Sequence, residues 1–257
     1  MNTIRAVLGL SFLPTALAFT PGFPYGSEKV RGVNFGGWLV PEPWITPSLF
    51  DNTGNSAIVD EWTFGQLQSH STALAALTTH WNTWTTESNF TAIAAAGLNH
   101  VRLPIGYWAF EVGPAGEPYI QGQLPYLTKA ITWATNHNLK LIIDLHGAPD
   151  SQNGFDNSGH RISTPGWASN NTNVQCTDAI IKTTANMVKD NTANVPRIAP
   201  LNELSSRGVI LPSLKTLILY GRLSDELSWK FMDFFALPAL QKLDITEHLF
   251  QEAPSIG

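Results

Sequence analysis

The sequence is poor in cysteine and in charge, and both shortages limit what the protein can be. Its 257 residues include a single cysteine, Cys176, so no disulfide can form within the chain and a folded domain must be stabilised by its apolar core. Charged residues make up 14% of the chain, the net charge is −5, and Lys and Arg form no cluster. Binding to nucleic acid requires clustered basic side chains that displace counterions, so we expect no nucleic-acid partner.

Long apolar runs are also scarce. The one clear run spans residues 6–18 and ends in an Ala-Leu-Ala triplet, which is typical of a secretory signal peptide. It is shorter than the roughly 20 residues that cross a bilayer. We therefore predict a signal peptide over residues 1–18, a secreted protein and no membrane anchor. Two glycosylation sequons of the form Asn-x-Thr, at Asn89 and Asn170, fit secretion.

Short runs of branched and aromatic residues, by contrast, are plentiful, and they alternate with longer segments of helical period. This alternation favours βα units around a parallel sheet. The expected strands are 30–40, 100–107, 139–145 and 197–201, and the expected helices are 74–96, 124–136 and 177–189. Four such steps in about 200 residues fit the front half of a (β/α)8 TIM barrel. An open doubly wound sheet is the alternative, but no Gly-rich phosphate loop follows the first strand.

Polar residues near the carboxyl ends of these strands are the candidate site, because barrel active sites lie at that end. Arg102 interrupts an apolar strand and needs a carboxylate partner, either as a structural ion pair or as part of a catalytic site. Asp144 and His146 share one face of a strand, which would suit metal ligands, but no third ligand matches them. We therefore expect no metal, and we interpret His146 as a group that binds a substrate hydroxyl.

Asn202 and Glu203 end the fourth strand together. An amide there can bind a sugar hydroxyl, and a buried carboxyl can protonate a leaving oxygen. The loop over residues 148–173 is rich in Gly, Asn, Ser and Pro, and a loop of that length is typically functional.

Four longer motifs add to these single residues: RGVNFGGWLVPEPW at 31–44, VRLPIGYW at 101–108, DLHGAP at 144–149 and SQNGFDNSG at 151–159. In this order they resemble the fungal exo-β-1,3-glucanase branch of glycoside hydrolase family five, and the resemblance runs from about residue 30 to residue 203. It implies an α/β TIM barrel and a secreted, retaining glycosidase with a two-carboxylate mechanism. The implied substrate is a β-1,3-glucan polysaccharide or oligosaccharide outside the cell or in its wall. Nothing in the sequence indicates an oligomer or a cofactor, so we expect a monomer without a cofactor.

The resemblance also implies roles for individual residues. Glu203 would be the general acid/base, and Asn202 would contact the 2-hydroxyl of the sugar. The remaining candidates would bind substrate: Arg102 and His146 at the pocket floor, Glu42, Asp156 and Asn157 on the non-reducing-end glucose, Phe155 as an aromatic wall, and His248 as a subsite histidine. For Asp156 and Asn157 a simple turn is the alternative interpretation.

The sequence departs from the family pattern after Glu203. Leu204 replaces a proline, and the segment 205–221 fits only loosely. We therefore expect residues 19–257 to be a partial catalytic barrel, with strands 1–4 clear and strand 5 and strands 7–8 missing. The nucleophilic Glu would be lost with the seventh strand. The alternatives are an inactive glucan-binding remnant or aberrant gene product, and a metal-dependent hydrolase built on Asp144 and His146.

Overall fold

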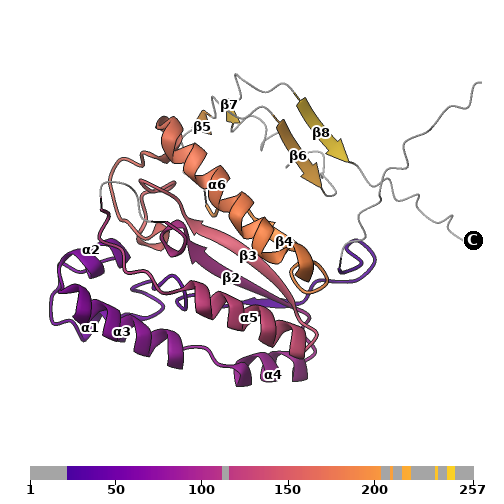
Figure 1. Ribbon diagram of the computed structural model, residues 1–257, viewed down its shortest axis with the longest axis horizontal. Coiled ribbons are helices and arrows are strands. Elements are labelled where there is room, and N and C mark those ends of the chain that lie inside the picture. The colour runs from indigo at the N-terminus through magenta and orange to yellow at the C-terminus, as the bar shows by residue number, and fades with distance from the viewer. Residues whose placement is uncertain are drawn as a thin grey trace, which may run out of the picture.

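The computed structural model describes residues 22–111 and 116–203 with their side chains (Figure 1). Beyond Glu203 it describes only the backbone of four short strands, β5 (Val209–Ile210), β6 (Thr216–Tyr220), β7 (Phe235–Ala236) and β8 (Lys242–Thr246). The signal peptide predicted over residues 1–18 and the candidate residue His248 both lie outside the described residues.

A parallel sheet forms the centre of the described structure. Its strands are β1 (Gly32–Asn34), β2 (His100–Gly106), β3 (Lys140–Gly147) and β4 (Arg197–Ala199), in the order β1-β2-β3-β4. Every neighbouring pair is parallel, with Val101 opposite Leu141 and Asp144 opposite Ala199. The sheet confirms the predicted strand order. The described strands β5 to β8 do not extend it, since they form two separate parallel pairs, β5 with β7 and β6 with β8.

Helices connect and cover these strands (Figure 1). The α-helices are α1 (Pro47–Asp51), α2 (Glu61–Gln66), α3 (His70–Thr83), α4 (Glu87–Ala95), α5 (Leu124–Asn136) and α6 (Asn171–Val188). Four short 3₁₀ helices accompany them: η1 (Tyr107–Ala109), η2 (Asp156–Ser158), η3 (Trp167–Ser169) and η4 (Lys189–Asn191). No helix within the described ranges has the length and apolar character needed to span a bilayer.

Helix caps explain two differences from the sequence-based expectations. The predicted helix 74–96 is two helices, because Thr86 and Asn89 form a capping box that starts α4 anew. The predicted helix 177–189 begins earlier, at Asn171, because Asn170 caps α6: its Oδ1 accepts a hydrogen bond from the Thr172 backbone N–H at 3.0 Å.

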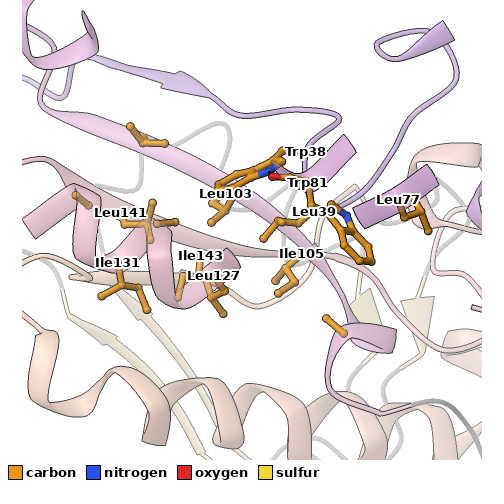
Figure 2. Packing of buried hydrophobic residues seen from close by; sticks show 14 of the residues in the cluster. Trp38, Leu39, Leu77, Trp81, Leu103, Ile105, Leu127, Ile131, Leu141 and Ile143 are labelled. Atoms are coloured by element: carbon orange, nitrogen blue, oxygen red, sulfur yellow. The ribbon is translucent and has the colours of Figure 1, made fainter. Parts of the chain in front are cut away.

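The core lies between the sheet and its helices. Alternate residues of β2 and β3 point to one face, where Leu103 and Ile143 pack with Leu77 and Trp81 of α3 and Leu127 of α5 (Figure 2). Burying each Leu or Ile stabilises the fold by about 1.5–3 kcal/mol. The other residues of the same strands face the opposite side of the sheet, and the polar candidates are among them.

Candidate active site

Arg102 links three strands at the polar face of the sheet. Its Nη2 lies 2.8 Å from Oδ2 of the buried Asp144 and donates a 2.7 Å hydrogen bond to Oδ1 of Asn202. Its Nη1 donates to Oδ1 of Asn34 at 3.1 Å. The carboxylate partner expected from the sequence is therefore Asp144. The Arg102 side chain is 32% exposed, whereas that of Asp144 is 1% exposed.

His146 has its tautomer set by Asp144. Nδ1 lies 2.6 Å from Asp144 Oδ2 and donates its proton to that carboxylate. Nε2 lies 3.5 Å from the Asn202 amide nitrogen and 4.0 Å from Glu42 Oε1. Asp144 Oδ2 is already engaged by both Arg102 and His146, and the described residues contain no group of three potential metal ligands.

Glu42 is a buried carboxyl beside this network, with 4% of its surface exposed. Burial raises its pKa, and the nearby Asp156 charge adds to the effect. His146 and a hydrogen bond from the Trp44 side chain oppose it. Trp44 was not singled out as a site residue, although it ends the motif at 31–44. It is 74% exposed, so its indole ring offers a free apolar face next to the Glu42 carboxyl.

Gln152 is a second residue that sequence reasoning missed. It is 3% exposed, and both protons of its amide nitrogen are used: one for the His146 carbonyl at 2.8 Å and one for the Asn202 carbonyl at 2.9 Å. Its Oε1 accepts from the Ala148 N–H at 3.0 Å. Gln152 therefore ties the end of β3 to the segment after β4. No sequence pattern signals it, because its partners come together only in the folded chain.

Glu203 lies at the end of this segment and is exposed, so the burial considered from the sequence is not present in the described part of the chain. Its Oε2 accepts a 2.8 Å hydrogen bond from the amide of Asn157, whose Oδ1 accepts in turn from Asn153 at 3.0 Å. Its φ of +41° lies in the left-handed region, a strain of about 1–3 kcal/mol for a residue other than glycine. The structure thus brings Asn157 to Glu203.

The loop over residues 148–173 presents Phe155, Asp156 and Asn157 to the site. The last two begin the 3₁₀ helix η2, so the turn considered as the alternative is present, and Asn157 also contacts Glu203. Phe155 is 62% exposed, and Asp156 is half-buried. The loop is anchored from outside. Asp60 caps α2 through Oδ1 and accepts the Arg161 N–H through Oδ2 at 2.6 Å.

Solved structures place this arrangement in a class of barrel proteins. The crystal structure of rutinosidase from Aspergillus niger matches 70% of this chain and 50% of its own with a TM-score of 0.63 and 24% identity. The crystal structure of AoRut matches 69% and 49% with a TM-score of 0.61 and 28% identity. The four-stranded parallel sheet is accordingly part of a (β/α)8 TIM barrel.

The family model described as Cellulase (glycosyl hydrolase family 5) matches residues 65–199. The chain therefore belongs to glycosyl hydrolase family 5. The probable glucan 1,3-beta-glucosidase A of Aspergillus niger is 55% identical over 167 residues, 61% of this chain and 39% of the relative. The protein of the same name from Emericella nidulans is 54% identical over 69% of this chain and 43% of its own length. The glucan 1,3-beta-glucosidase of Blumeria graminis is 47% identical over 75% and 45%. The chain thus spans less than half the length of these curated relatives.

Proposed function

We propose that the described residues form the acid/base side of a retaining glycoside hydrolase site for β-1,3-glucan, of the glucan exo-1,3-β-glucosidase type. The observation that carries the proposal is the placement of Glu203, which follows β4 at the polar end of the sheet and is held there by Asn157. Family membership supports a glycosidase, and the names of the curated relatives support β-1,3-glucan as the substrate class.

Glu203 would move the proton in both steps of such a reaction. It donates a proton to the glycosidic oxygen as the bond from that oxygen to the anomeric carbon breaks. In the second step it takes a proton from the water that attacks the same carbon. Its exposure in the described structure leaves the carboxyl accessible to a substrate.

Asn202 is oriented to bind the sugar beside Glu203. A guanidinium can only donate, so the Asn202 atom that faces Arg102 must be Oδ1. The amide nitrogen is then Nδ2, which faces Nε2 of His146 at the long distance of 3.5 Å. We assign this N–H group to the 2-hydroxyl of the sugar.

The rest of the substrate would meet hydroxyl-binding groups and aromatic faces. Glu42, Asp156 and His146 supply carboxyl and imidazole groups, and the exposed ring of Phe155 supplies an apolar wall for the sugar. We expect a β-glucan polysaccharide or oligosaccharide as the ligand, a monomeric protein and no cofactor. We also propose, from residues 1–18, that the protein is secreted and acts outside the cell or in its wall.

We assign no nucleophile among the described residues. A retaining glycosidase needs a second carboxylate about 5–5.5 Å from the acid/base to attack the anomeric carbon. Asp144 is engaged by Arg102 and His146, and Glu42 lies beside His146 in a buried position. The second candidate function is the binding of glucan without hydrolysis, for which the hydroxyl-binding groups and aromatic faces named above would suffice.

The test is glucose release from laminarin by the full chain, together with calorimetric binding of laminaritriose. Glu203→Gln is compared with Asp190→Asn, a control that removes an exposed carboxylate in η4, and circular dichroism verifies folding. For a hydrolase, Glu203→Gln lowers the rate about 10²–10⁴-fold and retains binding, while the control is unchanged. If the folded wild-type protein binds laminaritriose but releases no glucose from laminarin, the second function is supported. If it neither binds laminaritriose nor releases glucose, both functions are contradicted.

A further inference from the structure

Asn170, the first residue of one Asn-x-Thr sequon, is exposed at the amino end of α6. Its Oδ1 accepts the Thr172 backbone N–H at 3.0 Å, which makes it the cap of that helix. A backbone N–H can only donate, so this contact identifies the capping atom as oxygen and leaves the amide nitrogen, Nδ2, on the other side. Within the described residues Nδ2 of Asn170 takes part in no hydrogen bond.

Asn89, the first residue of the other sequon, repeats this arrangement in the first turn of α4. It is exposed, and its Oδ1 accepts the Thr86 backbone N–H at 2.8 Å. Its Nδ2 likewise has no hydrogen-bond partner in the described part of the chain. Thr91, the third residue of this sequon, is exposed as well, and its hydroxyl donates to the Glu87 carbonyl at 3.2 Å.

In both sequons the oxygen and the nitrogen of the asparagine side chain can therefore have different roles. The oxygen of each asparagine is used by the fold to satisfy a helix-terminal N–H. The nitrogen, which is the atom that a glycan would modify, makes no part of that contact and belongs to a residue that is exposed. A sugar on Nδ2 leaves the capping oxygen unchanged, so the folded structure can carry it without losing either helix cap.

We propose that Asn89 and Asn170 both carry N-linked glycans, an inference that rests on the proposed secretion of the protein. The donor is a lipid-linked oligosaccharide diphosphate. The lone pair of Nδ2 forms a bond to the anomeric carbon of the first sugar, and the bond from that carbon to the diphosphate oxygen breaks, so that the lipid diphosphate leaves with the electron pair. A base of the transferase takes one Nδ2 proton, and the product amide keeps the other.

The two glycans would lie at opposite ends of the sheet. Helix α6 begins at the end towards which β2 and β3 point, which is also the end where Glu203 lies, whereas α4 lies at the other end (Figure 1). The glycan on Asn170 would therefore border the side of the substrate site. The glycan on Asn89 would be remote from it.

The experiment uses the full chain with its own amino terminus, expressed in a yeast that secretes proteins. Intact mass is measured before and after peptide N-glycosidase treatment, and each formerly glycosylated asparagine is identified as aspartate in peptide spectra. Thr91→Ala and Thr172→Ala remove one sequon each without touching the capping asparagine. Thr91→Ser and Thr172→Ser are matched controls that retain the sequons.

We expect two mass steps for the wild type and for both serine variants, one step for each alanine variant, and none for the double alanine variant. Bare protein in the medium overturns the inference and leaves secretion intact, and an unmodified asparagine at one site overturns it for that site. If the chain stays in the cell, the proposed secretion from residues 1–18 fails. The same chain is then directed by the yeast's own secretory leader: glycans at both sites support the inference, and a bare chain overturns it.

Discussion

Replacing Gln152 with leucine tests how strongly the two strand ends are joined. Leucine has nearly the same size as glutamine, so the change removes hydrogen bonds with little loss of packing. It leaves three backbone groups without their partner: the carbonyls of His146 and Asn202 and the N–H of Ala148. Each buried polar group left unsatisfied costs about 1–3 kcal/mol. With three such groups, we expect the free energy of unfolding to fall by about 3–9 kcal/mol.

The assay for this prediction is urea unfolding of the full chain, followed by tryptophan fluorescence, which the nine tryptophans make sensitive. Gln175→Leu in α6 is the matched control, because Gln175 is exposed and the same chemical change there should stay within about 0.5 kcal/mol. Laminaritriose binding is measured in parallel. A Gln152→Leu protein as stable as the control would refute the reasoning, since it would show that these three groups do not depend on the glutamine.

Three further predictions concern ionisable side chains. Burial raises the pKa of Glu61 well above its usual value, so the folded state favours the neutral form of this carboxyl. The stability linked to Glu61 is full below about pH 4.5 and is lost as pH rises towards the folded-state pKa. We therefore expect melting temperatures measured across a pH series to vary less for Glu61→Gln than for the wild type. Arg102→Met leaves the buried Asp144 without the Arg102 cation and should lower the free energy of unfolding in urea by about 2–3 kcal/mol, less than for a fully buried pair because Arg102 is partly exposed. Arg102→Lys retains the charge and should cost less. An equal loss for both variants would contradict the charge argument. Asp60→Ala removes the α2 cap and the contact with Arg161, so we expect the free energy of unfolding to fall by about 1–2 kcal/mol and proteolysis within residues 148–173 to become faster. Unchanged proteolysis would mean that other contacts hold the loop.

The sequence predicted the fold best where its signals were continuous. The helix expected over 124–136 has the bounds of α5, and the strand expected over 139–145 differs from β3 by only a residue or two at each end. The first strand was predicted too long. It was expected over 30–40, but β1 ends at Asn34, and Gly37 with its φ of +72° belongs to the turn that follows. Apolar runs indicate buried backbone, but they do not show where strand pairing stops.

The site was predicted in its parts but not in its connections. The position of His146 near a strand end and the charge of Arg102 inside an apolar strand were sufficient to nominate them. The sequence did not single out Trp44 and Gln152, because the groups that an indole or an amide contacts are known only from the folded structure. The contact between Gln152 and the Asn202 carbonyl joins positions 50 residues apart. No local pattern encodes such a contact.

The contacts of Arg102 also have a kinetic consequence. Its hydrogen bond to Asn202 closes a stretch of 100 residues, and its bond to Asn34 closes one of 68. Closing a flexible loop of 100 residues costs about 4 kcal/mol of chain entropy, which these bonds cannot offset before the strands have paired. The polar end of the sheet should therefore assemble late in folding, after β1 to β4 are aligned, and parallel strands that depend on distant partners fold slowly. A newly made chain would have its helices and apolar face in place while Asn202 and Glu203 were still unattached.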